Sequence, residues 1–285
     1  MNAIATPADA TAVGGAPEEG GVADRLRWAV ADGWTITRRD VAHWLRRPGQ
    51  LVAGLLFPVM MLLMFGFLFG GAMTVPGDGD YREFLMPGMF AMTMVFGVGE
   101  TVTAVSNDVA RGVTDRFRSM PMAPSAVVVG RCAADMVRST ITLAVLVGCG
   151  LLAGWQWNGT GGEAAAGIGL LLLLRFSLVW PGIYVGLLAR GEGAVTAVHT
   201  LEFPLGFLSN AFVATATMPL WLGALADWNP LSSTVTATRE LFGNPGWGGE
   251  TWVAQNALPM AVVWPLVIVA VFFPLCVRRY RNMAR

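Results

Sequence analysis

The chain has 285 residues, of which 54% are hydrophobic and only 13% are charged, with a formal net charge of zero. A water-soluble domain carries about a quarter charged residues, so this composition excludes an ordinary soluble protein. Several apolar stretches reach the ~20 residues that a helix needs to cross a bilayer. We therefore expect an all-α polytopic membrane protein.

The basic residues narrow the function further. All 19 of them are arginine, and the sequence contains no lysine. A P-loop needs its lysine to reach the phosphates of ATP, and Schiff-base chemistry needs a lysine amine. The chain is therefore not a conventional P-loop ATPase, and any ATP hydrolysis that drives it belongs to another subunit.

The first part of the chain differs from the rest in composition. Residues 1–22 are rich in Ala, Gly and Pro without periodicity, which predicts a disordered cytoplasmic tail. Residues 24–47 alternate apolar residues with arginine and include Trp28, Trp34 and Trp44. Arginine on one face and tryptophan on the other favour an amphipathic helix that lies along the membrane surface.

Six apolar stretches then predict six transmembrane helices. Their expected bounds are 51–71, 84–106, 137–153, 164–188, 194–216 and 256–277. The third helix would instead start at Ser125 if Arg131, Asp135 and Arg138 form an interfacial first turn. The region 218–255 is rich in tryptophan but is broken by Pro219, Pro230 and Pro245. We expect it to be extracellular, with two short re-entrant helices, at 219–226 and 232–242, that dip into the outer leaflet before the last span.

The distribution of arginine predicts the orientation of these spans. Nearly all arginines lie in the amphipathic segment, the loop 107–131, the turn after the fourth span and the C-terminal end, whereas the opposite loops hold Arg82 and Arg239 alone. Because cytoplasmic loops carry the excess of basic residues, both termini are expected to be cytoplasmic.

Three charged residues interrupt the apolar stretches, namely Glu100, Arg175 and Glu202. With a rise of ~1.5 Å per residue, Arg175 and Glu202 both lie near the middle of a core of ~30 Å. We expect these two residues to form a pair between the fourth and fifth spans. A place on the substrate path and a structural brace are equally compatible with such a pair. His199 precedes Glu202 by three residues and is expected to be an interfacial histidine rather than part of a proton relay.

The loop 107–131 separates two long apolar runs. It contains a compact block, GVTDRFRSMP at 112–121, in which charges alternate with an aromatic residue. Such a block either fixes orientation only or docks into a groove on a partner, with the aromatic side chain as anchor. We favour docking, and the candidate contact residues are Gly112, Asp115, Arg116, Phe117, Arg118 and Pro121.

Several motifs together resemble one family. They are FLMPG at 84–88, GVTDRFRSMP at 112–121, NAFV at 210–213, MPLWL at 218–222 and NPL at 229–231 followed by Arg239. In order and spacing the chain resembles, over residues 23–285, the type-2 (ABC-2) permeases of ABC transporters, in particular the daunorubicin-resistance type of multidrug export permease.

The resemblance implies a permease subunit of an ATP-driven exporter that moves an amphipathic drug or antibiotic-like molecule out of a bacterial cell. It implies a dimer of permeases with two copies of a separate ATPase, which binds ATP and Mg, and a coupling helix at 112–121. No enzymatic activity, metal or cofactor is expected on this chain, and nucleic acid is not an expected partner. The alternatives are an exporter of a glycolipid or polysaccharide and an ion-coupled secondary transporter.

Overall fold

A computed structural model describes residues 48–68, 80–114, 124–189, 191–246, 249 and 251–283. This part of the chain is helical and contains no strand. Its elements are α2 (Pro48–Leu68), α3 (Tyr81–Ala110), α5 (Pro124–Leu152), α6 (Gly161–Leu188), α7 (Glu192–Phe207), the 3-10 turn η1 (Thr215–Thr217), α8 (Leu220–Asp227), α9 (Pro230–Leu241), α10 (Trp252–Gln255) and α11 (Ala257–Asn282).

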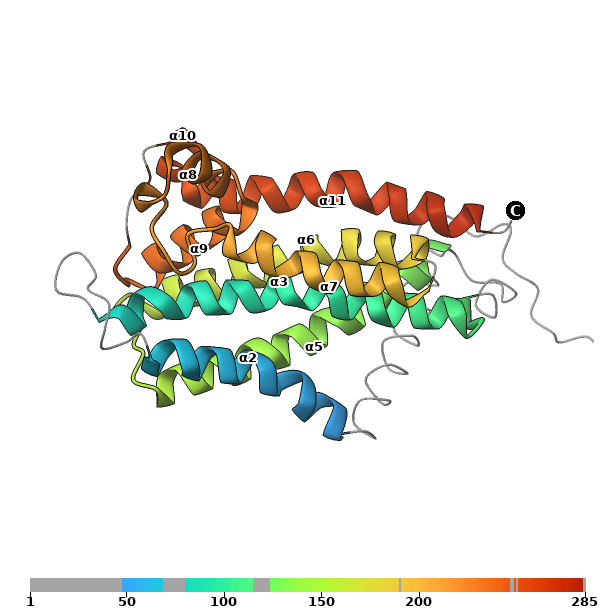
Figure 1. Ribbon diagram of the computed structural model, residues 1–285, viewed down its shortest axis with the longest axis horizontal. Coiled ribbons are helices and arrows are strands. Elements are labelled where there is room, and N and C mark those ends of the chain that lie inside the picture. Colours follow the sequence, from blue (N-terminus) through green and yellow to red (C-terminus); the bar gives the residue numbers. More distant parts are fainter. Residues whose placement is uncertain are drawn as a thin grey trace, which may run out of the picture.

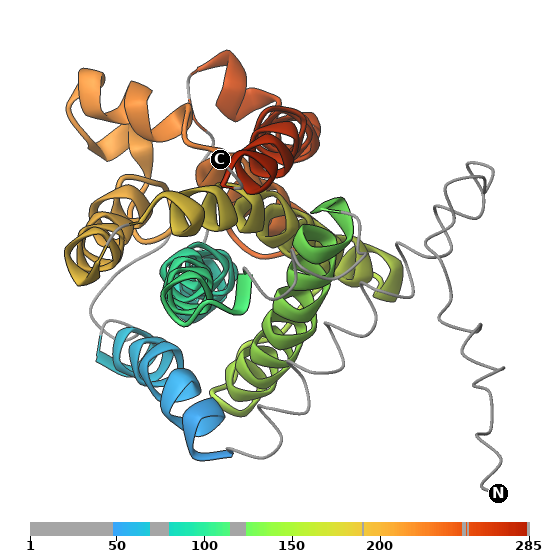
Figure 2. The same ribbon diagram turned by 90° about the vertical axis from the view of Figure 1, so that its right-hand side faces the viewer.

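The long helices form a bundle around α3. They run roughly along the long axis of the molecule, while α8, α9 and α10 gather at one end (Figure 1). Seen along the bundle, α2, α5, α6 and α7 surround α3 (Figure 2). Accordingly Phe84, Phe90 and Met92 of α3 are fully buried. The contact with α6 is close because a Cβ atom at Gly186 would lie 2.7 Å from the Cβ atom of Val105.

In the part of the chain that the structure describes, four helices are long and apolar enough to cross a membrane. They are α3, α6, α11 and the part of α5 from Val127 to Leu152. Helix α2 contains a shorter apolar stretch, Val52–Leu68, and α7 has only 16 residues. The structure therefore supports a multi-pass membrane protein, whereas six crossings remain a prediction.

Helix α7 ends at Phe207, well before the predicted end at position 216. The amide of Asn229 donates hydrogen bonds to the carbonyl oxygens of Leu205 at 2.9 Å and Leu208 at 2.6 Å. The chain after α7 is bonded to α9, because the backbone N–H of Asn210 donates a hydrogen bond to Ser232 Oγ at 3.2 Å. Partners from distant residues thus satisfy the backbone where the helix stops.

The third helix is longer than the predicted span 137–153. Helix α5 begins at Pro124, next to the alternative start at Ser125, so Arg131, Asp135 and Arg138 all lie in the helix. Short helices at 220–227 and 230–241 lie close to the two that were expected, and their depth in a membrane stays a prediction. The tail 1–22, the amphipathic segment 24–47 and most of the docking block lie outside the described residues.

Candidate functional site

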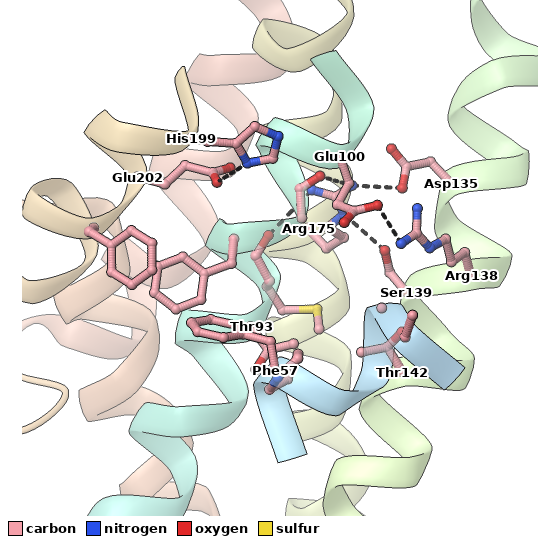
Figure 3. A pocket seen from close by; sticks show the side chains of 17 residues that line it. Phe57, Thr93, Glu100, Asp135, Arg138, Ser139, Thr142, Arg175, His199 and Glu202 are labelled. Carbon is pink, nitrogen blue, oxygen red and sulfur yellow. Dashed lines mark hydrogen bonds and ion pairs between the residues drawn. The ribbon is translucent and has the colours of Figure 1, made fainter. Parts of the chain in front are cut away.

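A polar cavity of about 300 Å³ lies inside the bundle, next to the middle of α3 (Figure 3). Side chains from α2, α3, α5, α6 and α7 line it, and they include Phe57, Phe96, Glu100, Asp135, Arg138, Ser139, Arg175, His199, Glu202 and Phe203. All three charged residues that the sequence singles out therefore border one cavity.

Arg175 is the most completely enclosed of these charges, with 1% of its side chain exposed. Its Nη2 atom donates to Asp135 Oδ1 at 2.6 Å and to the carbonyl oxygen of Gly97 at 2.9 Å. Nε donates to Ser139 Oγ at 2.9 Å, and Nη1 donates to a further carbonyl of α3. Every nitrogen of the guanidinium has an acceptor from the protein.

The predicted pairing of Arg175 with Glu202 is therefore wrong. The acidic partner of Arg175 is Asp135 in α5, and Glu202 binds elsewhere (Figure 3). The reason is geometric, because depth along a helix does not determine which face a side chain occupies. Glu202 still lines the same cavity as Arg175.

Two glycines allow these charged side chains to approach α3. A Cβ atom at Gly97 would lie 2.8 Å from Cζ of Arg175, and one at Gly99 would lie 2.8 Å from Oε2 of Glu202. The absence of side chains at both positions exposes the α3 backbone to α6 on one side and to α7 on the other. The Gly97 carbonyl and the Gly99 N–H are then available to side chains of neighbouring helices.

Glu202 lies at the contact between α3 and α7. Its Oε1 accepts a hydrogen bond from the backbone N–H of Gly99, and its Oε2 lies 3.4 Å from Nδ1 of His199. The other ring nitrogen of His199 lies 3.0 Å from Thr103 Oγ1. Glu202 is 6% exposed, so its carboxylate is buried without an arginine partner among the described residues.

Glu100 and Arg138 form a second ion pair in the cavity. Arg138 Nη2 lies 2.5 Å from Glu100 Oε2, with 27% and 47% of the two side chains exposed. This pair is more accessible than the pair of Arg175 and Asp135. When both pairs are counted as neutral, Glu202 is the one carboxylate among the described lining residues that is balanced only if His199 is protonated.

Aromatic rings form another part of the cavity wall. The ring centroids of Phe57 and Phe96 are 6.0 Å apart, those of Phe96 and Phe203 are 5.0 Å apart, and those of Phe57 and Phe203 are 5.9 Å apart. This triangle joins α2, α3 and α7. The cavity thus combines charged groups with an aromatic surface, as in sites for amphipathic ligands.

Sequence reasoning missed the contribution of α5. Asp135, Arg138 and Ser139 all line the cavity, whereas the sequence reasoning considered Asp135 and Arg138 only as part of an interfacial first turn of this helix. Asp135 and Ser139 are four residues apart and therefore share a helix face. This spacing beside an apolar run indicates a polar helix face. Together with a charged residue, Arg175, inside another apolar run, it would have indicated that this face points into the bundle.

Only the beginning of the docking block is described. Gly112 lies in the turn after α3 with a φ of 66°, and the tyrosine hydroxyl of Tyr280 donates to the carbonyl oxygen of Thr114 at 3.5 Å. Near this end of the bundle, Arg131 of α5 pairs with Asp108 of α3 at 3.1 Å. The remaining docking candidates, Asp115, Arg116, Phe117, Arg118 and Pro121, lie outside the described residues.

A bundle of helices that are long and apolar enough to cross a membrane, around a cavity with charged side chains in its wall, is typical of a multi-pass membrane protein. Residues 32–242 match the family described as ABC-2 type transporter. The chain belongs to this family, as the sequence motifs predicted, and it is a permease of that class. Membership implies an ATPase partner in general.

Three relatives illustrate the range of the family. The chain is 35% identical to the daunorubicin resistance ABC transporter permease protein DrrB1 of Streptomyces coeruleorubidus, over 82% of this chain and 81% of that protein. It is 28% identical to a protein of Pyropia yezoensis named as transport permease ycf38, over 74% of each chain. A protein of Mycobacterium tuberculosis named as doxorubicin resistance ABC transporter permease DrrC is 20% identical, over 77% of this chain and 79% of that one.

Proposed function

We propose that the chain is the permease subunit of an ATP-driven exporter that moves an amphipathic, drug-like or antibiotic-like molecule out of a bacterial cell. The observation that carries this proposal is the likeness to a daunorubicin resistance permease over 82% of the chain. The cavity supports it, because charged groups and the aromatic triangle of Phe57, Phe96 and Phe203 together suit a ligand with a polar and an apolar part.

Energy comes from a separate ATPase subunit that binds ATP and Mg, and the block 112–121 docks to it. Two features support this assignment. The chain lacks the lysine of a P-loop, and the block connects α3 with α5, which both contribute ion-pairing residues to the cavity. A push on this connection therefore acts directly on the two helices that hold Glu100 and Asp135.

The complete exporter contains two permease copies and two ATPase copies in the bacterial cell membrane. Each permease crosses the membrane six times, with α2 and α7 completing the four longer helices, and both termini are cytoplasmic. The arginines Arg278, Arg279 and Arg281 near the end of α11 support this orientation. The end of the bundle that carries α8, α9 and α10 then faces outward.

Within the cavity, Arg175 acts as a brace rather than as a contact for cargo. Its nitrogens are all bonded to the protein and its side chain is 1% exposed, so little of it remains to bind a ligand. Glu202 and the more exposed Glu100 are better placed to meet cargo. Replacement of Arg175 by leucine is expected to reduce the amount of folded protein and not only transport.

The experiment that tests this function measures ATPase activity in vesicles that contain the chain and a candidate ATPase subunit. The double variant Phe117→Ala plus Arg118→Ala is expected to uncouple or detach the ATPase while the permease stays folded. A matched control is Trp221→Ala plus Glu240→Ala, which removes an exposed aromatic and an exposed charge at the opposite end of the bundle. Unchanged activity and co-purification in the first variant would contradict the docking assignment and leave the block as an orientation signal only.

A further inference from the structure

A chain of hydrogen bonds links α3 to α7, and its hydrogen atoms can be counted. The hydroxyl of Thr103 donates to the carbonyl oxygen of Gly99, four residues earlier in α3, at 2.7 Å. A hydroxyl group has a single hydrogen atom, so Thr103 Oγ1 accepts at its second contact, which is with His199 Nε2 at 3.0 Å. Nε2 of His199 therefore carries a hydrogen atom.

The other ring nitrogen of His199 faces a carboxylate oxygen. Nδ1 lies 3.4 Å from Oε2 of Glu202, and Figure 3 shows the two side chains directed at each other. In a neutral imidazole one nitrogen is a donor and the other an acceptor, so a hydrogen atom on Nε2 makes Nδ1 the acceptor. An ionised carboxylate accepts as well. Two acceptors would face each other here unless one further proton lies between them, on the carboxyl group or on the ring.

The surrounding charges require the same proton. The titratable groups that face the pair across the polar cavity come from three helices and are Glu100 of α3, Asp135 and Arg138 of α5 and Arg175 of α6. They form two ion pairs, so their charges cancel. The described lining residues of α2 include no titratable group. On its other side Glu202 borders an apolar groove of about 540 Å³, whose described lining has no second titratable residue.

With one proton, the pair of His199 and Glu202 is therefore neutral. Without that proton, the pair carries a full negative charge in the middle of the bundle, which is costly in a membrane. The count of hydrogen atoms and the count of charges thus agree, although they rest on different contacts.

We infer that His199 and Glu202 bind one proton and that this proton holds α7 against α3. Both side chains attach α7 to α3, because Glu202 Oε1 accepts from the Gly99 N–H and His199 bonds Thr103. Loss of the proton leaves two facing acceptors and an unbalanced charge at this contact, which favours separation of the helices. The side chain of His199 is 43% exposed, so water reaches the ring and exchanges the proton. This inference goes beyond the proposed function, since it involves neither cargo nor ATPase.

Nitrogen NMR tests the assignment of the proton. The chain contains two histidines, and the second one, His43, lies outside the described residues. In the full chain with His43→Gln, placed in lipid nanodiscs with isotope-labelled histidine, every imidazole signal comes from His199. Near neutral pH we expect a hydrogen atom on Nε2 and a hydrogen bond at Nδ1. An unprotonated Nε2, or an Nδ1 without a hydrogen bond, would overturn the inference.

The distance between α3 and α7 tests whether the proton holds the helices together. Spin labels are attached to Ala110→Cys at the end of α3 and Thr196→Cys in α7, two exposed positions, and electron paramagnetic resonance measures their separation. As the pH rises from about 5 to about 9, we expect the mean distance to lengthen by at least about 2 Å, the size of helix shifts in conformational transitions. A distance that is independent of pH would overturn the inference.

Glu202→Gln separates this proton from other effects of pH. The amide oxygen of glutamine accepts from Gly99 and its NH₂ group donates to Nδ1 of His199, so the variant imitates the protonated pair permanently. We expect the short distance to persist throughout the same pH range.

Glu192→Gln is the matched control, because it removes an exposed carboxylate at the start of the same helix. It should respond to pH as the wild-type chain does. If Glu202→Gln responds in the same way, another group binds the proton and the inference is wrong. Since neither ATPase nor drug is present, this failure leaves the coupling experiment above unaffected.

Discussion

Arg175 of α6 and Asp135 of α5 form an ion pair at 2.6 Å, with side chains that are 1% and 9% exposed. The same guanidinium bonds the Gly97 carbonyl of α3 at 2.9 Å. One side chain therefore ties three helices of the bundle together. A buried charge of this kind is strongly dependent on its partner, because its desolvation is compensated only while the pair is intact.

Asp135→Asn is expected to destabilise the folded chain by about 3–5 kcal/mol, since it leaves the guanidinium of Arg175 without a counter-charge. Unfolding of the detergent-solubilised chain by denaturant measures this free energy. The double variant Asp135→Leu plus Arg175→Leu removes both charges, so it should regain much of the lost stability.

Glu100→Gln is the control for this prediction. Its pair with Arg138 is 27% and 47% exposed, and accessible pairs contribute only about 0–1 kcal/mol. If Asp135→Asn costs no more stability than Glu100→Gln, Arg175 is not a brace that depends on Asp135.

Gly99→Ala is expected to force α7 away from α3. The new Cβ atom would lie 2.8 Å from Oε2 of Glu202 and within contact of the His199 ring. Overpacking of this kind typically costs about 1–3 kcal/mol, which should appear as a lower thermal midpoint in detergent. Gly169→Ala in α6 is the matched control, because no atom lies within 4 Å of its added Cβ. Alanine favours a helix, so this control should be neutral or slightly stabilising, and equal losses in the two variants would contradict the steric argument.

The sequence predicted the helices that are decided by local composition. Continuous apolar runs identified α3, α6 and α11, and a charge inside an apolar run was enough to single out Glu100, Arg175 and Glu202, which the structure brings to one cavity. Their partners could not be predicted in this way. The choice of Asp135 over Glu202 depends on how the helices are rotated about their axes, which a single sequence does not determine.

The end of α7 could not be predicted for a related reason. The sequence remains largely apolar up to position 216, so local composition favours a continued helix. In the structure, the side-chain amide of Asn229 donates hydrogen bonds to the carbonyl oxygens of Leu205 and Leu208, although Asn229 follows them by more than twenty residues. A helix end that is fixed by hydrogen bonds from a distant side chain leaves no signal in the sequence of the helix itself.

The two ends of α6 are expected to lie on opposite sides of the membrane. Gly162 lies in its first turn and Glu192 lies just after its end, and both are exposed. In the proposed orientation, a membrane-impermeant maleimide should label Gly162→Cys in intact cells and Glu192→Cys only after permeabilisation. The wild-type chain is the control, since Cys132 and Cys276 are buried and Cys149 is partly buried in α5. Labelling in the opposite order would reverse the orientation.

Arg239 is a buried cation of a different kind from Arg175. It is 3% exposed, and within the described part of the chain it has no carboxylate partner. Its Nε donates to the carbonyl oxygen of Phe84 at 2.8 Å and its Nη2 to that of Ala211 at 2.9 Å, while its Cζ lies 3.7 Å from the centroid of the Phe84 ring. The planar guanidinium thus joins α9 to the start of α3 and to the turn after α7, by hydrogen bonds in its plane and by the ring beneath it.

A double-mutant cycle between Arg239 and Phe84 is expected to give a coupling energy of about 1–2 kcal/mol, because the cation over the ring is desolvated. The variants are Arg239→Met, Phe84→Leu and both together, compared by denaturant unfolding in detergent. The control cycle uses Arg82 and Phe67. The distance from Cζ of Arg82 to the centroid of the Phe67 ring is 5.0 Å, and Phe67 is 57% exposed. There the coupling should be about 0.5 kcal/mol. If the first cycle does not exceed the second, the ring adds nothing to the two carbonyl bonds, and Arg239 holds this end of the bundle by hydrogen bonding alone.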